Sequence, residues 1–144
     1  MELALIGLAK SGKTTVFNAL TGGKAETSLF AGGKVEPNIA VVKVPDPRVD
    51  KLAEIYQPKK VTYATVKYVD VAGIARESDS PEKGVPEALL QFVSRADALI
   101  AVIRGFEDPV HGAPRIASDV ETVHLELVFS DLAKVETRLQ KLEK

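Results

Sequence analysis

One loop near the N-terminus constrains the fold of this chain more than any other feature of its sequence. Residues 7–14 read GLAKSGKT and match the pattern GxxxxGK[ST] in full, directly after the apolar run at residues 3–6. A loop of this kind joins a buried strand to the first turn of a helix, and its backbone amides form an anion cradle there. The motif therefore predicts an α/β fold whose loop binds a nucleoside triphosphate, ATP or GTP.

The positions of the loop have separate expected roles. Gly7 and Gly12 permit the turn and the close approach of a phosphate, and Lys13 can reach the β- and γ-phosphates. The hydroxyl of Thr14 can hold Mg²⁺. The further residues expected to contact the nucleotide are Leu8, Ala9, Lys10, Ser11 and Thr15. A glycine-rich turn without a ligand is the alternative, but the sequence on both sides of the loop argues against it.

A second motif, DxxG at residues 70–73, ends a predicted strand over 62–71. An acidic residue at a strand tip can bind Mg²⁺ through water, and a glycine three positions later can offer its amide to a γ-phosphate. DxxG alone is usually a strand-ending turn, and its pairing with the upstream loop favours the functional interpretation. We therefore predict Thr14 and Asp70 as the magnesium-binding residues and Gly73 as the contact to the γ-phosphate.

The remaining sequence predicts the other elements of a mostly parallel sheet with helices on both faces. Strands are expected over 38–44, 62–71 and 98–103, and helices over 15–20, from Asp46 or Pro47 to about residue 55, and over 86–96. The first two of these strands could pair as a hairpin. The continuously apolar run at 98–103 is typical of a parallel strand buried on both faces. The polar, breaker-rich segments 21–35 and 75–84 are candidate switch loops.

The last segment predicts one long helix. Ser118 to Glu121 fit a capping box at its start, and apolar residues then recur at alternating spacings of three and four over 125–142. We expect this heptad seam to project and pair with a partner helix, with packing on the sheet as the alternative. The chain would then consist of an incomplete nucleotide-binding domain, 1–117, and the first helix of a coiled coil, 118–144. No return helix follows the seam, so we expect a fragment or a partner from elsewhere.

Composition narrows the class of protein. The 144 residues include 19 basic and 20 acidic side chains, a net charge of −1, so no global field attracts nucleic acid or a membrane. Cysteine is absent, which excludes disulfides and thiolate metal sites. No stretch approaches the ~20 apolar residues of a membrane-spanning helix. We therefore expect a cytoplasmic protein without a membrane partner.

The order of strand, phosphate loop, switch, DxxG, helix and buried strand resembles the Ras-like G domain of translation-factor-class P-loop GTPases. Five short stretches narrow the likeness to the YchF/Obg-like ATPase family: FNALT at 17–21, EPN at 36–38, VPDPR at 44–48, DVAGI at 70–74 and FED at 106–108. In that family a coiled-coil insertion begins where 118–142 lie. The resemblance implies a Mg²⁺-dependent ATP or GTP hydrolase that associates with ribosomes.

The resemblance also places Ile74 where many GTPases carry a water-orienting glutamine, so intrinsic hydrolysis should be slow; packing of Ile74 in the domain is the alternative. Three features depart from the family pattern. The segment ESDSPEK at 77–83 replaces a glycine-rich switch and is stiffer and more acidic. Lys10 replaces an asparagine associated with a monovalent cation, and its ammonium could replace that cation; an exposed lysine is the alternative. Lys34 replaces a switch threonine, so Thr27 or Ser28 would have to complete the Mg²⁺ site. The candidate catalytic residues are thus Lys13, Lys10 and Ile74.

Two other function classes stay open. A nucleotide-dependent interaction module without hydrolysis is favoured by Ile74, Lys34 and the heptad seam. A P-loop kinase of small molecules is disfavoured because the arginines at 76, 95, 104 and 115 are scattered without the pattern of a lid. The base cannot be assigned, because the only asparagines are Asn18 and Asn38 and the expected base-recognition motif is absent.

Overall fold

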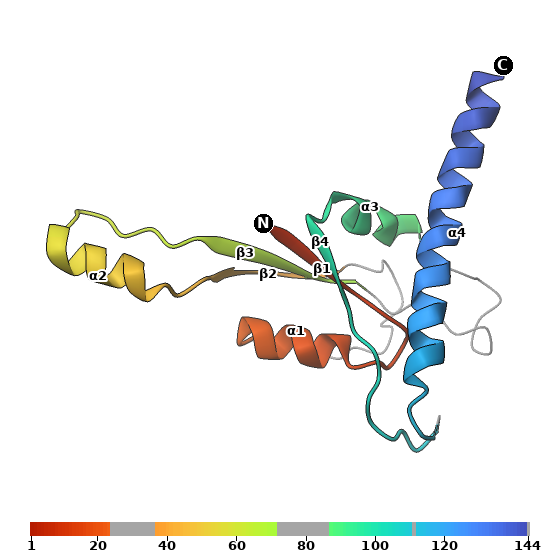
Figure 1. Cartoon of the computed structure of the whole chain (residues 1–144), viewed down its shortest axis with the longest axis horizontal. Helices are drawn as coiled ribbons and strands as arrows, with labels where there is room; N and C mark the ends of the chain where they lie inside the picture. The colour runs from red at the N-terminus through yellow and green to blue at the C-terminus, as the bar shows by residue number, and fades with distance from the viewer. Residues whose placement is uncertain (24–36, 72–86, 111, 144) are drawn as a thin grey trace.

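The computed structural model describes residues 1–23, 37–71, 87–110 and 112–143. The elements, in chain order (Figure 1), are β1 (Glu2–Ile6), α1 (Lys13–Thr21), β2 (Asn38–Lys43), α2 (Pro47–Tyr56), β3 (Thr65–Asp70), α3 (Glu87–Arg95), β4 (Ala98–Ala101) and α4 (Ile116–Leu142).

The described strands form one sheet in the order β2-β3-β1-β4. β1 runs parallel to both of its neighbours, and its residue Leu5 pairs with Asp70 on one side and with Ile100 on the other. β2 runs antiparallel to β3, which sets Asn38 opposite Asp70. These pairings confirm the predicted mostly parallel sheet and its antiparallel second strand.

Helices α1 and α3 lie on opposite sides of this sheet (Figure 1). Successive residues of a strand point to opposite faces, so β1 contributes to both layers. Ala4 is buried with Val69 on the side where Phe92 of α3 packs. Leu5 points to the opposite face and is fully buried, and Phe17 of α1 is only 3% exposed. The predicted layering of helices on both faces is therefore confirmed.

β2 and β3 continue past the sheet as a ribbon that carries α2 at its end (Figure 1). The ribbon extends beyond the strands because the amide of Val44 donates to the carbonyl of Ala64 at 2.9 Å. Asp46 caps α2, since its carboxylate accepts from the amide of Arg48 at 2.9 Å, and Pro47 is the first helical residue. The predicted start of this helix is confirmed, and so is the hairpin-like pair of strands.

β4 is shorter and more exposed than its sequence predicts. It ends at Ala101, two residues before the expected end at residue 103, and lies at an edge of the described sheet. Its parallel pairing with β1 is as predicted. However, Leu99 is 39% exposed, because α1 and α3 pack mainly over β1 and β3 (Figure 1). Burial of this run on both faces was a wrong prediction for the described residues.

The capping box predicted for α4 is also wrong. The helix begins at Ile116, and Arg115 occupies the cap position without any side-chain capping hydrogen bond. The amide of Asp119 donates to the carbonyl of Arg115 at 2.8 Å, so the backbone hydrogen bonds of the helix begin before Ser118. The hydroxyl of Ser118 therefore lies inside the first turn, where it cannot act as the cap.

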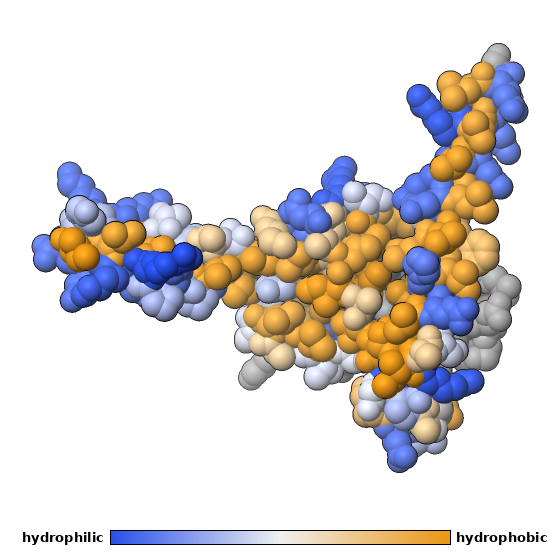
Figure 2. Space-filling view, viewed as in Figure 1, coloured by the Kyte–Doolittle hydropathy of each residue, from blue (hydrophilic) through white to orange (hydrophobic). Residues whose placement is uncertain are grey.

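The buried side of α4 is not the heptad seam. Val123 is buried in a cluster with Ile6 and Leu8, and Leu127 packs against this cluster. The seam residues, by contrast, are all 45% exposed or more: Leu125, Val128, Leu132, Val135, Leu139 and Leu142. Figures 1 and 2 show α4 extending beyond the sheet with apolar side chains along the extended part. The seam thus projects as predicted and does not pack on the sheet.

Candidate functional site

The phosphate loop spans the gap between the end of β1 at Ile6 and the start of α1 at Lys13. A side chain at Gly7 would place its Cβ 2.3 Å from the carbonyl oxygen of Val102, so only glycine fits there. Gly12 caps α1 with a left-handed φ of 98° and no side-chain capping hydrogen bond. The N-terminal end of α1 therefore faces the loop without a side chain to satisfy it, as an anion site requires.

Lys13 lies inside this loop. Its side chain is only 6% exposed, and its Nζ donates to the carbonyl oxygen of Leu8 at 2.7 Å. Burial lowers the pKa of Lys13 to about 8, and the negative charge of Asp70 partly offsets this effect. The lysine is thus a largely desolvated cation whose ammonium, among the described residues, donates to the loop itself.

The two predicted magnesium-binding residues lie in contact. Thr14 donates its hydroxyl to Oδ2 of Asp70 at 2.8 Å, and Asp70 is buried to within 5% of its surface. The side-chain amide of Asn38 donates to the same oxygen at 3.3 Å. Hydroxyl and carboxylate oxygens are the donors that Mg²⁺ prefers, so this pair fits the ion. Among the described residues, no group of three or more histidine, cysteine, aspartate or glutamate side chains could hold a metal ion.

Ser11 adds a buried polar group to the loop. Its hydroxyl has no hydrogen-bond partner among the described residues, and its amide donates to the carbonyl of Leu8 at 3.3 Å. The other predicted contacts are more open: Ala9 is half-buried, while Lys10 and Thr15 are exposed. Lys10 adopts a left-handed φ of 59°, which sharpens the turn of the loop. The structure brings Lys13, Thr14 and Asp70 together and leaves Lys10 apart from them.

Sequence reasoning missed two contributors to this site. The sequence analysis gives Asn38 no role in the magnesium site, although the antiparallel pairing of its strand with residues 65–70 sets it beside Asp70. Arg104 was counted among scattered arginines, yet it is 1% exposed and bonded to backbone carbonyls beside the phosphate loop. A buried arginine used in this way is not available as a lid residue, which adds to the argument against a kinase.

Several sequence predictions concern residues outside the described ranges. These are the γ-phosphate contact Gly73, the catalytic candidate Ile74 and the switch positions Thr27, Ser28 and Lys34. Their roles stay predictions.

Comparison with known proteins identifies relatives along nearly the whole chain. Residues 2–137 match the family described as 50S ribosome-binding GTPase. The chain is 40% identical over 147 aligned positions to the ribosome-binding ATPase YchF of Haemophilus ducreyi, covering 99% of this chain and 40% of that protein. It is 35% identical to the ribosome-binding ATPase YchF of Bacillus subtilis, covering 100% of this chain and 40% of the relative.

A solved structure agrees with these sequence matches. The YchF GTPase of Schizosaccharomyces pombe superimposes with a TM-score of 0.71 at 30% identity, over 99% of this chain and 39% of the other. The fold is thus that of a P-loop GTPase, and the YchF/Obg-like resemblance is confirmed. The chain spans about two fifths of the length of the relatives it matches. No helix among the described residues is long and apolar enough to span a membrane.

Proposed function

Because the chain belongs to the family of 50S ribosome-binding GTPases, we propose that it binds ATP or GTP with Mg²⁺ at residues 7–14 and hydrolyses the γ-phosphate slowly. The observation that carries this proposal is the placement of a buried Lys13 beside a contacting pair of oxygen donors, Thr14 and Asp70. A strand-to-helix turn without a ligand would have no use for this arrangement, because burying a lysine in it costs free energy.

In this proposal Lys13 and the loop amides bind the phosphates. The ammonium of Lys13 leaves the carbonyl of Leu8 and pairs with the β- and γ-phosphate oxygens, where it stabilises the charge that develops during transfer. Water attacks the γ-phosphorus in line with the departing diphosphate. The buried hydroxyl of Ser11 faces the same enclosed loop and gains a hydrogen-bond partner from the nucleotide.

Thr14 and Asp70 would hold Mg²⁺ in the complex. The ion neutralises charge on the β- and γ-phosphates when it is bound. Thr14 would offer its hydroxyl oxygen and Asp70 its carboxylate as ligands to that ion. The side-chain amide of Asn38, which donates to Asp70 from the β2 side, would orient this carboxylate.

The rate of hydrolysis depends in this proposal on Ile74, Gly73 and Lys10. Gly73 donates its amide to the γ-phosphate, and Ile74 cannot orient water, which makes turnover slow. The exposed ammonium of Lys10 takes the place of a monovalent cation. Activity should therefore be the same in potassium and sodium salts, and stimulation by potassium would remove Lys10 from this role.

The partner in this proposal is the ribosome, and the compartment is the cytoplasm. The matched family is described as 50S ribosome-binding, and the Haemophilus ducreyi relative carries the name ribosome-binding ATPase. The exposed seam at 125–142 supports a second contact, with a partner helix. We place the division between the nucleotide-binding domain and this coiled-coil segment at residues 117 and 118.

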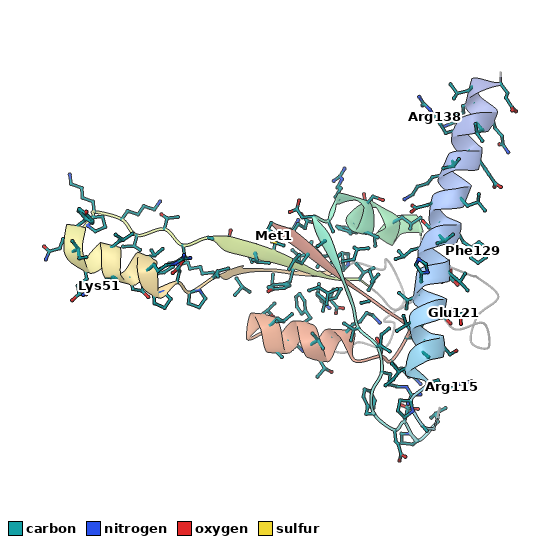
Figure 3. The ribbon with its side chains drawn as sticks, viewed as in Figure 1. Met1, Lys51, Arg115, Glu121, Phe129 and Arg138 are labelled. Carbon is teal, nitrogen blue, oxygen red and sulfur yellow. The ribbon has the colours of Figure 1, made fainter. Side chains whose placement is uncertain are left out.

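Titration of labelled ATP and GTP in the presence of Mg²⁺ tests the proposal. Lys13→Ala should abolish binding and hydrolysis, because Lys10, the other lysine of the loop, is exposed and cannot replace the buried ammonium. Lys51→Ala is the matched control, since Lys51 is an exposed lysine on α2 whose ion pair with Glu54 is remote from the loop (Figure 3). Single-turnover release of phosphate then separates a hydrolase from an interaction module, which would bind the nucleotide and leave it intact. Equal turnover in wild type and Lys13→Ala would refute the assignment of this lysine.

A further inference from the structure

The segment after β4 contains a buried arginine that the proposed nucleotide chemistry does not use. Arg104 is 1% exposed. Its Nη1 donates to the carbonyls of Phe106 and Gly112, each at 2.8 Å, and its Nη2 donates to the carbonyl of Ala113 at 3.1 Å. One guanidinium thus binds carbonyls at both ends of the turn over residues 104–113, of which the structure describes all but residue 111.

The same turn is closed by its own backbone. The amide of Asp108 donates to the carbonyl of Gly112 at 3.1 Å, and the amide of Gly112 donates back at 2.7 Å. Gly112 has a left-handed φ of 65°, which closes this turn without a steric penalty. The buried Arg104 therefore lies inside a closed turn, where its fork of donors ties together carbonyls from both ends of that turn.

The segment after β4 borders the phosphate loop at both of its glycines, through Val102 before the turn and through Phe106 within it. The carbonyl of Val102 occupies the space where a side chain of Gly7 would lie, and the amide of Val102 donates to Ile6 at 2.8 Å. The ring of Phe106 lies 3.7 Å from the position of a Cβ on Gly12. The carbonyl of Phe106 is one of the acceptors of Arg104, so the guanidinium fixes the residue that borders Gly12.

We propose that Arg104 is a positioning residue for nucleotide binding, which holds the turn over residues 104–113 against the phosphate loop. It acts through Phe106, whose carbonyl it holds, and touches no nucleotide itself. This inference rests on the proposed function of the loop. Its consequence is that loss of the guanidinium weakens nucleotide affinity more than it slows the chemical step, because the loop is less well ordered before binding but reaches the same bound geometry.

The experiment measures the Kd of Mg²⁺ with labelled ATP or GTP and the single-turnover rate at saturating nucleotide, in the full chain. Arg104→Lys keeps the charge but cannot span three carbonyls, and Arg104→Ala removes the group. Each should raise Kd by about ten- to a hundredfold, while the saturated rate changes by less than about threefold. Arg138→Ala is the control, because Arg138 lies near the free end of α4 (Figure 3) and should bind like wild type.

Chemical rescue separates positioning from general destabilisation. Guanidinium ions at millimolar concentration should restore affinity to Arg104→Ala and leave Lys13→Ala unrescued. Unchanged affinity in the Arg104 variants, or parallel loss of affinity and saturated rate without rescue, would overturn the proposal. If neither variant folds, amide hydrogen exchange of the wild type tests the proposal instead. Nucleotide should slow exchange of the 104–113 amides, and unaltered exchange there would contradict the positioning role of Arg104. Wild type that fails to bind nucleotide would refute the proposed function itself.

Discussion

At the scale of single residues, the charge of Lys13 makes nucleotide binding depend on pH. Its pKa in the free protein is about 8, because burial disfavours the ammonium. A polyphosphate prefers the protonated lysine, so binding raises this pKa. At pH values just above 8, Lys13 is therefore deprotonated in part of the free protein but protonated in the complex. Binding must then take up a proton.

The prediction is an uptake of up to one proton per nucleotide bound at about pH 8.5 to 9, with affinity falling as pH rises through this range. The phosphate groups do not contribute, because their last ionisation near pH 6 is complete there. Calorimetry in buffers of different ionisation enthalpy measures the uptake. Below pH 7 the contribution of Lys13 should vanish, since the lysine is protonated in both states. A complex that forms at pH 9 without taking up a proton would show that Lys13 does not pair with phosphate.

The carboxylate of Asp70 should set the dependence of binding on Mg²⁺. Asp70→Asn removes the charge and keeps an oxygen that can accept from the Thr14 hydroxyl, so the fold is retained. We expect the Mg²⁺ concentration needed for nucleotide binding to rise about 10- to 100-fold. Titration of Mg²⁺ at fixed nucleotide measures the effect. Asp131→Asn, on the exposed part of α4, is the isosteric control. An unchanged Mg²⁺ requirement in Asp70→Asn would assign the ion to other ligands.

At the scale of elements, the two sides of α4 should differ in their contribution to stability. Val123 is buried against Ile6 and Leu8, so Val123→Ala should lower the free energy of unfolding by about 2 kcal/mol. Leu139 is 53% exposed, so Leu139→Ala should change it by less than about 0.5 kcal/mol. Urea unfolding measures both. Equal losses would mean that the seam is packed in solution, against the structure.

The sequence predicted the elements well where the signal came from residues close together in the chain. The phosphate loop, the Asp46 cap and the antiparallel ribbon all follow from short-range chemistry, since glycine, proline and capping residues act on their own neighbours. The wrong predictions concern burial and helix starts. An apolar run such as 98–103 has the same sequence pattern whether its strand lies at the centre or at the edge of a sheet. The start of α4 was misplaced because its backbone hydrogen bonds begin at Arg115, before the polar residues of the expected cap.

The sequence motifs predict the residues at the centre of the candidate site, but not the residues that hold them in place. Lys13, Thr14 and Asp70 were identified because each belongs to a spaced pattern whose chemistry is known. Asn38 and Arg104 belong to neither of these two motifs, and each reaches the site through a pairing or a turn that only the folded chain creates. A signal existed for Asn38, because it sits at the end of one predicted hairpin strand and Asp70 at the matching end of the other.

At the scale of the whole molecule, the phosphate loop and the projecting helix share one packing cluster. Leu8 belongs to the loop, and Val123 belongs to α4, and both are buried in the cluster that also contains Ile6. Ile103, from the segment after β4, and Leu127 of α4 pack against the same cluster. A ligand that fixes the loop therefore acts on residues that hold the base of α4, without any contact to the helix itself.

This connection predicts how far the effect of nucleotide extends. Binding should slow amide hydrogen exchange in the 7–14 loop and also in residues 116–127 of α4, because openings that release Val123 also disturb Leu8. Residues 131–142, where every side chain is exposed, should exchange at the same rate with and without nucleotide. Exchange measured by mass spectrometry with and without Mg²⁺ and ATP or GTP tests this, with Lys13→Ala as the control that cannot bind. Protection confined to the loop and α1 would show that α4 is not coupled to the phosphate site, and any response of a partner on the seam would then need another route.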